Sequence, residues 1–243
     1  MAKRFIVDDN NIEKIDKDVF LITGKEVKHI QVLRHNIGDK ITVNENIYEI
    51  IKMKRDSITL KFIDVAPKVG EPNINTTLYL ALIKKENMEI AIKKAVEVGV
   101  KKIVPFICEN VVIKLDKKDF IKRKEKFKIY ANEACKQCGR TDSVEVCDIL
   151  TYKDFINMLA NDKNILFAYE NEKTSLKDAI YKIKKEETKN VSLIIGPEGG
   201  FTKKEALEIS NLQNVLPVSL GSRILRAETA VIYLLSIIIY ELD

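Results

Sequence analysis

From residue 77 onward, short apolar runs alternate with amphipathic helical patterns, and this rhythm constrains the fold more than any other feature of the chain. The apolar runs are typical of strands buried on both faces, and the stretches between them have the spacing of helices. Such alternation predicts an α/β fold with a mostly parallel sheet that is covered by helices on both faces. The expected strands are residues 77–83, 103–108, 164–169, 191–195 and 215–220.

The first 70 residues have a different rhythm. Short strand-like runs follow one another, interrupted by one helical pattern at 25–34 and joined by a clear turn around Asn44. This pattern predicts a small β-barrel. A polar linker that contains Gly70 and Pro72 comes next, so we expect two domains, 1–70 and 74–243.

Composition bounds the class of protein. Hydrophobic residues make up 46% of the chain and charged residues 32%, which is typical of a soluble globular protein. The longest apolar run, 230–240, is far shorter than the ~20 residues of a membrane span. The first residues lack the apolar core of a signal peptide, so we expect a cytoplasmic protein without a membrane partner.

The net charge of +5 is concentrated between residues 114 and 128, where eight Lys/Arg residues stand against three acidic ones. A solvated helix face is one explanation of such a run. Contact with the phosphates of a nucleic acid is the other, because clustered cations release counterions on binding. The sequence leaves both open, and Lys122 and Arg123 are candidates for RNA binding.

Cys135 and Cys138 form a C-x-x-C pair. No second pair and no nearby histidine accompany them, and they lie in a helical pattern, whereas zinc ribbons place such pairs in tight turns. We therefore interpret them as buried or chance thiols and expect no metal site.

Two glycine-bearing segments, 196–202 and 220–230, each follow a predicted strand and open a helical pattern. Glycine lets a ligand approach the backbone closely, and the carboxyl ends of parallel strands form the ligand crevice of α/β sheets. The first segment fits neither a P-loop nor a dinucleotide fingerprint, so a tight turn is its alternative explanation. In the second, Arg223 and Arg226 flank an apolar pair, which favours a flat ligand beside an anion.

Both segments resemble a known family. Leu-Ile-Ile-Gly-Pro-Glu-Gly-Gly-Phe-Thr at 193–202 and Leu-Gly-Ser-Arg-Ile-Leu-Arg-Ala-Glu-Thr-Ala at 220–230 are similar to the signature of the bacterial ribosomal RNA small-subunit methyltransferase E family. The similarity extends over nearly the whole chain. Further matching segments are Arg4-Phe5, residues 29–34, residues 93–100 and residues 132–140, where Lys136 replaces the usual Glu and Cys138 the usual Ser.

The resemblance implies a PUA-like barrel at the N-terminus and a SPOUT domain whose chain forms a deep trefoil knot. It implies a homodimer in which the partner subunit completes each active site. The implied reaction is methylation of N3 of a specific uridine in 16S rRNA of the 30S subunit, with S-adenosylmethionine as cofactor. The remaining alternatives are a related knotted methyltransferase acting on tRNA or a ribose 2′-oxygen, and a non-catalytic RNA-binding protein.

The resemblance also implies roles for residues. Arg226 would stabilise the deprotonated uracil or a flanking phosphate, with Glu228 orienting it. Glu198 would be the general base or a partner in a structural ion pair. The residues expected to hold the cofactor are Tyr169, Glu170, Gly196, Gly199, Gly200, Ser219, Leu220, Gly221, Ile224 and Leu225. Further candidates for RNA binding are Arg4, His29, Arg34, Gln137 and Arg140, of which His29 could equally be a satisfied domain-interface histidine.

Overall fold

The computed structural model describes residues 4–67, 70–111, 117–140 and 142–243, so Lys114 and Asp116 of the basic run lie outside the described residues. The chain divides into two compact units, which we describe one at a time. The first unit comprises Met1–Glu71 and Cys135–Ser143, and the second comprises Pro72–Ala134 and Val144–Asp243. The second domain expected from the sequence, 74–243, included the segment Cys135–Ser143, whereas the structure groups this segment with the first unit.

The first unit contains a six-stranded sheet in the order β1-β4-β5-β6-β3-β2. Strand β1 pairs in parallel with β4, and the other neighbours are antiparallel. The predicted turn at Asn44 joins β4 to β5, and its φ of 53° is a left-handed conformation that asparagine tolerates. The elements are β1 (Arg4–Phe5), the 3₁₀ helix η1 (Asp9–Asn11), β2 (Ile12–Asp16), β3 (Val19–Thr23), α1 (Lys25–Val32), β4 (Lys40–Val43), β5 (Asn46–Met53) and β6 (Ser57–Val65).

The core of this unit lies between the sheet and α1. Val27 and Ile30 of α1 are fully buried with Phe5, Ile22 and other strand residues. Strand β2 was not expected from the sequence, because most of its side chains are exposed and charged and it shows no apolar alternation.

The second unit is an α/β domain whose six strands are all parallel, in the order β12-β10-β11-β7-β8-β9. The predicted α/β fold with a mostly parallel sheet is confirmed. The strands are β7 (Asn75–Ala81), β8 (Lys102–Phe106), β9 (Glu145–Val146), β10 (Ile165–Ala168), β11 (Asn190–Ile195) and β12 (Val215–Val218). Strand β9 was not expected, since two residues are too short for a pattern.

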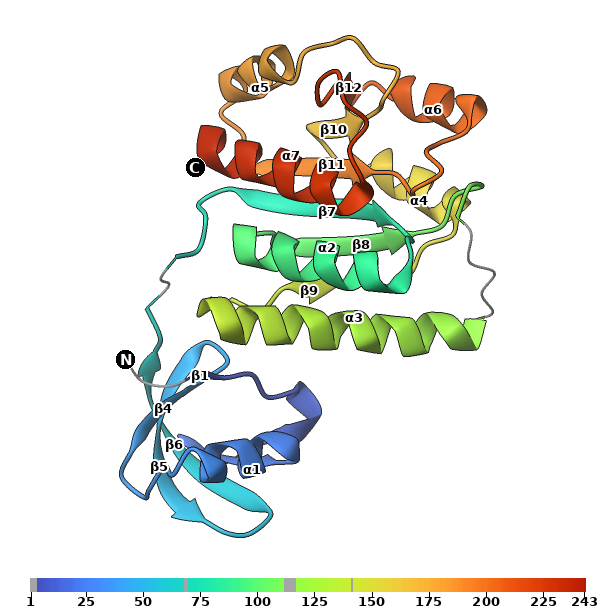
Figure 1. The fold of residues 1–243 in the computed structure, drawn as a ribbon. Coiled ribbons are helices and arrows are strands. Elements are labelled where there is room, and N and C mark those ends of the chain that lie inside the picture. The colour runs from blue at the N-terminus through green and yellow to red at the C-terminus, as the bar shows by residue number, and fades with distance from the viewer. Residues whose placement is uncertain (1–3, 68–69, 112–116, 141) are drawn as a thin grey trace. The chain divides into compact units, whose positions relative to one another are not determined.

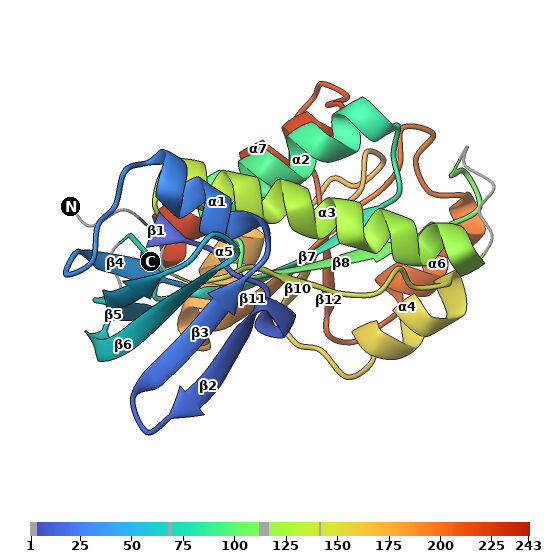
Figure 2. The ribbon, with the colours of Figure 1, turned by 90° about the horizontal axis from the view of Figure 1, so that it is seen from below.

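Helices cover both faces of this sheet. Helices α2 and α7 pack against each other on one face and begin at the carboxyl edge of the strands (Figure 1). On the other face, α4 and α6 bury apolar side chains such as Phe155 and Ile209 against the strands (Figure 2). The helices are α2 (Lys85–Val98), α3 (Lys117–Cys138), α4 (Tyr152–Leu159), α5 (Leu176–Lys185), α6 (Lys203–Ser210) and α7 (Ala227–Leu242).

Helix α7 is less enclosed than its sequence indicates. Its apolar residues suggest burial all round, and Val231, Leu234 and Ile238 are indeed fully buried. Tyr233 and Tyr240 are nevertheless exposed, because α7 packs on α2 and β11 with one flank and leaves another uncovered. Among the residues described, no helix is both long and apolar enough to span a membrane.

A partly buried polar network ties two of the strands to the segment before β10. The Asp162 carboxylate accepts hydrogen bonds from the Tyr79 hydroxyl at 2.8 Å and from Ser192 Oγ at 2.6 Å. Burial and the Asp162 carboxylate both raise the pKa of Tyr79, so its hydroxyl stays protonated and donates. The network therefore joins β7 and β11 to the segment before β10.

Replacing Asp162 by alanine should destabilise the protein by about 3 kcal/mol, because two buried hydroxyls lose a charged acceptor at once. Chemical denaturation at pH 7 measures the free energy of unfolding. Ser192→Ala is the matched control, and it should cost only about 1 kcal/mol because it removes one donor and leaves the Tyr79 bond intact. Equal losses in the two variants would contradict this account.

Candidate active site

A cavity of about 410 Å³ lies at the carboxyl edge of the sheet in the second unit. The segments that follow β10, β11 and β12 line it, including both glycine-bearing segments identified in the sequence. All ten residues expected to hold a cofactor line this cavity, together with Glu198 and Arg226. The fold thus gathers residues from 169 to 226 around one space, as the ends of neighbouring parallel strands should.

Gly196 is required by packing within the protein. A Cβ atom there would lie 2.7 Å from Cε2 of Phe201. The Phe201 ring is buried and meets the Phe167 ring edge-on at 5.1 Å, so it has little room to retreat. Gly196 therefore allows the chain to turn tightly over Phe201 at the wall of the cavity.

Asn110 fixes the other end of this loop. Its side-chain amide donates to the carbonyl oxygens of Gly199 at 3.2 Å and Gly200 at 3.1 Å. Gly200 has a φ of 65°, and its N–H donates to the carbonyl of Pro197 at 2.9 Å. Sequence reasoning missed Asn110, because it belongs to no motif and is distant in sequence from the loop it holds.

A capping box begins α6. Thr202 accepts a hydrogen bond from the N–H of Glu205, and the Glu205 carboxylate accepts from the N–H of Thr202 at 2.9 Å. The same carboxylate also accepts from the N–H of Glu109 at 2.8 Å. One buried carboxylate thus anchors both the end of the glycine loop and the segment that carries Asn110.

Glu198 ties the loop to helix α2. Its Oε1 accepts hydrogen bonds from the N–H of Lys84, at 3.0 Å, and from the Asn87 side chain, at 3.4 Å. The carboxylate therefore caps the amino end of α2, where unpaired N–H groups and the helix dipole favour a negative charge. Glu198 therefore has a structural role, and it fills this role through hydrogen bonds and not through the ion pair considered from the sequence.

The second loop exposes an apolar side chain between two arginines. Ile224 is 89% exposed, and Arg223 and Arg226 are exposed beside it at the cavity. Gly221 has a φ of 111° and open space around its Cα, so the loop takes a backbone path that favours glycine. The apolar and cationic groups here are available to a ligand with an apolar part and a negative charge.

The expected pairing of Arg226 with Glu228 does not form, since no ion pair joins them in the part of the chain that the structure describes. Arg226 is the N-cap of α7 and has an extended backbone, Glu228 is in the first turn, and the buried Glu228 Oε2 atom has no hydrogen-bond partner among the described residues. The prediction that Glu228 orients Arg226 is therefore wrong.

Tyr169 and Glu170 form the third side of the cavity. The Tyr169 ring stacks on Phe167 at 5.5 Å, which leaves its position well defined. The Glu170 carboxylate lies against Gly200, where an added Cβ atom would be 2.9 Å from Oε1. Within the described residues no hydrogen bond reaches this carboxylate, whereas that of Glu198 is occupied by α2.

Comparison with known proteins gives this site a family. A model of the RNA methyltransferase domain matches residues 70–239. Proteins named ribosomal RNA small subunit methyltransferase E are 30% identical to this chain in Mesomycoplasma hyopneumoniae, over 96% of this chain and 97% of the relative, and in Bacillus subtilis, over 99% and 97%. The chain belongs to the ribosomal RNA small subunit methyltransferase E family. The resemblance found in the sequence is confirmed.

Solved structures agree with this assignment. A methyltransferase from Legionella pneumophila, solved in complex with S-adenosylmethionine, is 28% identical and has a TM-score of 0.79 over 98% of this chain and 97% of its own. A ribosomal RNA small subunit methyltransferase E from Neisseria gonorrhoeae, bound to S-adenosyl methionine, shares the fold with a TM-score of 0.83. It is 23% identical over 98% of this chain and 96% of its own.

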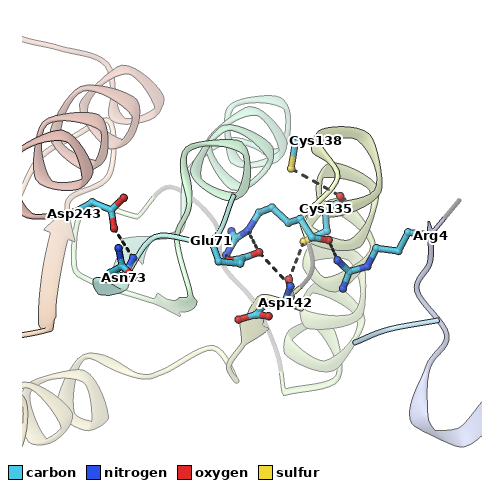
Figure 3. A network of polar contacts seen from close by, with 8 residues as sticks. Arg4, Glu71, Asn73, Cys135, Cys138, Asp142 and Asp243 are labelled. Carbon is cyan, nitrogen blue, oxygen red and sulfur yellow. Dashed lines mark hydrogen bonds and ion pairs between the residues drawn. The ribbon is translucent and has the colours of Figure 1, made fainter. Parts of the chain in front are cut away.

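Arg140 does not fit its predicted role in RNA binding. Its guanidinium is 4% exposed and binds the Glu71 carboxylate with two nitrogens, Nε at 3.1 Å and a terminal nitrogen at 2.7 Å. Glu71 also accepts from the N–H of Asp142 in the network of Figure 3. The guanidinium group of Arg140 is engaged in a bidentate ion pair inside the first unit, so it is not available to bind a phosphate.

Arg4 is also engaged in this network. It donates to the backbone carbonyl of Arg140, and burial lowers its pKa despite the acidic groups nearby (Figure 3). The structure thus brings Arg4 and Arg140 together but turns both inward. His29, Arg34 and Gln137 are exposed in the same unit and stay candidates for RNA binding.

The substitution at Lys136 has a structural explanation. Its ammonium group pairs with Glu26 at 2.7 Å, and His29 Nδ1 lies 3.1 Å from the same carboxylate. Burial alone would raise the pKa of Glu26, but these two partners outweigh it and lower the pKa. The lysine therefore compensates a nearly buried carboxylate that a glutamate at 136 would repel.

Proposed function

We propose that this protein transfers a methyl group from S-adenosylmethionine to N3 of a specific uridine in 16S rRNA of the 30S subunit. The observation that carries the proposal is the single cavity lined by both glycine loops in a member of this family. The relative from Legionella pneumophila was solved with the same cofactor. The expected cytoplasmic location follows from the proposed substrate.

The residues at the cavity suit this cofactor. Gly196, Gly199 and Gly200 supply backbone without side chains, and Ile224 offers an apolar surface for a flat base. The Glu170 carboxylate, which accepts no hydrogen bond from the described residues, can accept hydrogen bonds from ribose hydroxyls. When bound, the cofactor supplies a methyl group that is attached to a sulfonium. The rest of the cofactor leaves as a neutral thioether, so the transfer needs no metal.

The proposed chemistry depends on a proton. The N3–H of uracil is weakly acidic, so transfer needs either its removal or stabilisation of the anion that develops. Arg226 is exposed at the cavity without an ion-pair partner among the described residues, and we assign it to the developing charge on uracil. Glu198 holds α2 through Oε1, and its role as general base is the second part of the proposal.

Replacing Glu198 by glutamine separates its two roles. Glutamine keeps an acceptor oxygen for Lys84 and Asn87 but cannot take a proton. If Glu198 is the base, kcat should fall at least 100-fold while the dissociation constant of S-adenosylmethionine stays unchanged. Loss of the charge at the amino end of α2 should lower the free energy of unfolding by no more than about 1 kcal/mol. A variant with full kcat would leave Glu198 only its structural role.

We also propose the family's fold features and assembly for this chain. Residues 1–70 would form a PUA-like RNA-binding domain, and 74–243 a SPOUT domain in which the loops at 196–200 and 219–225 pass around each other in a trefoil knot. The assembly would be a homodimer whose partner completes the active site. An uncovered groove of about 610 Å³ between α5 and α7, with exposed Tyr181 and Tyr233, supports a second copy as its occupant.

Calorimetry with S-adenosylmethionine tests the enzymatic function first. Binding that the demethylated cofactor competes for is expected, and an absence of heat would favour a non-catalytic RNA-binding protein. Incubation with labelled cofactor then compares unmodified 16S rRNA with tRNA. Label at N3 of a uridine in 16S rRNA supports the proposal, and label in tRNA or at a ribose 2′-oxygen would support the related knotted methyltransferase instead.

A further inference from the structure

Three cations lie near one another on helices α2 and α3 in the second unit: Lys85 is the first residue of α2, and Arg123 and Lys126 belong to α3, which begins at Lys117. Lys126 of α3 and Lys93 of α2 both lie over the ring of Tyr130, which places Lys126 beside α2, where it interacts with Lys85. Contact with Lys85 is the largest cause that lowers the pKa of Lys126, and the charge of Arg123 adds to it. Like charges held this close are unfavourable unless an anion lies between them.

The three cations differ from neighbouring lysines because they lack an ion-pair partner among the residues that the structure describes. Neighbouring lysines do have partners: Lys93 pairs with Glu89 at 2.8 Å and with Glu133 at 3.0 Å, and Lys124 pairs with Asp148 at 2.7 Å. In the described ranges, no ion pair reaches Lys85, Arg123 or Lys126. We call these three residues the α2–α3 cation cluster.

Packing holds one member of the cluster, Lys126, in place. The Lys126 ammonium group lies 5.8 Å from the centre of the Tyr130 ring, and that ring is buried between the two helices with Lys93 on it as well. A lysine that rests on an aromatic face samples fewer positions than a free one, so its charge is partly preorganised. The Glu89 carboxylate attracts Lys126 from a distance, but its short contact is to Lys93.

Lys85 connects the cluster to the candidate active site. Lys84, the residue before Lys85, donates its N–H to Glu198, which lines the cavity. Consecutive Cα atoms are about 3.8 Å apart, so Lys85 stands one residue beyond a group that touches the glycine loop. Helices α2 and α3 both begin at the same edge of the domain as the cavity (Figure 1).

We propose that Lys85, Arg123 and Lys126 bind a backbone phosphate of the RNA beside the nucleotide that enters the cavity. A phosphate between the two lysines removes their repulsion and releases counterions. Such contacts fix the register of the strand without reading its sequence, which leaves recognition of the target base to the cavity. This inference rests on the proposed function for the identity of its ligand.

The test uses two double variants of the full chain. In Lys85→Gln/Lys126→Gln the cluster is dismantled. The matched control, Lys124→Gln/Lys128→Gln, removes two lysines of the same helix that already pair with Asp148 and Glu125. Both should bind S-adenosylmethionine like the wild type, which shows that the second unit is folded.

Affinity for a 16S rRNA fragment is then measured across a salt series. The cluster variant should bind at least tenfold more weakly, and its slope of log K against log salt should fall by about 0.7 for each phosphate that the variant no longer neutralises. The control should keep the affinity and the slope of the wild type. An unchanged affinity for RNA in the cluster variant overturns the inference. A polyglutamate peptide serves as a second anionic probe, and a variant that loses binding to this peptide while its RNA binding stays intact also overturns the inference.

Methyl transfer separates this result from the proposed function. If the wild type modifies rRNA and the cluster variant does so with an unchanged KM, the function stands and the phosphate site is wrong. If the wild type modifies no rRNA but the cluster variant still loses RNA affinity, the phosphate site stands and the proposed reaction is wrong.

Discussion

Gly196→Ala is expected to weaken binding of S-adenosylmethionine at least 100-fold. The added methyl group would lie 2.7 Å from Phe201, whose ring packs on Phe167 and stacks near Phe106 at 6.2 Å. Because the ring cannot retreat into a packed core, the backbone must move, and Gly199 and Gly200 move with it. Overpacking of this kind should also cost about 2 kcal/mol of unfolding free energy. Calorimetry and chemical denaturation measure the two effects.

Two further variants make this prediction specific. Gly139→Ala adds a methyl group at a left-handed glycine with open space around it, so it should lose about 1 kcal/mol of stability and keep cofactor binding. Adding Phe201→Leu to Gly196→Ala gives the methyl group room and should recover part of the affinity. Normal cofactor binding by Gly196→Ala alone would mean that this loop does not form the cofactor site.

Arg226→Ala should lower kcat for methyl transfer at least 100-fold while the dissociation constant of the cofactor changes less than twofold. The guanidinium is exposed at the cavity and has no ion-pair partner in the described part of the chain, so its removal disturbs no internal ion pair there. Loss of a single group that stabilises a developing anion costs about 10²–10³ in rate. Single-turnover transfer at saturating cofactor isolates the chemical step.

Arg226→Lys keeps the charge but not the planar guanidinium, and it should recover only part of the rate. The comparison separates a charge effect from a bidentate contact. Full transfer by Arg226→Ala would remove this residue from the mechanism, and a parallel loss of cofactor affinity would reassign it to cofactor binding.

Periodicity was sufficient to predict most of the sheet. Residues 191–195 were expected as a buried strand, and β11 spans Asn190–Ile195 with five of its six residues buried, because an apolar run of that length fits a covered parallel strand. The glycine loops could be assigned to one site for the same reason, since neighbouring strands end at the same edge. Strand β2 is exposed and charged, so no apolar pattern marks it.

Partners distant in sequence decide what could not be predicted. Arg140 looks like a surface cation until Glu71, 69 residues away, is placed against it. Glu198 looks like a free carboxylate in a glycine loop, but Lys84, 114 residues away, donates to it. The expected pair of Arg226 and Glu228 was a local inference, and it does not form among the described residues, where the buried Glu228 Oε2 atom has no hydrogen-bond partner. The roles of these single residues therefore depend on contacts with residues that are distant in sequence and belong to none of the motifs.

The central claim is that this chain methylates N3 of one uridine in 16S rRNA. Mass mapping of 16S rRNA from a strain that lacks the gene tests it most directly. The account predicts that a single N3-methyluridine disappears, that the wild-type gene restores it and that a gene encoding Arg226→Ala does not. A 16S rRNA that keeps this methyl group in the deletion strain would contradict the account.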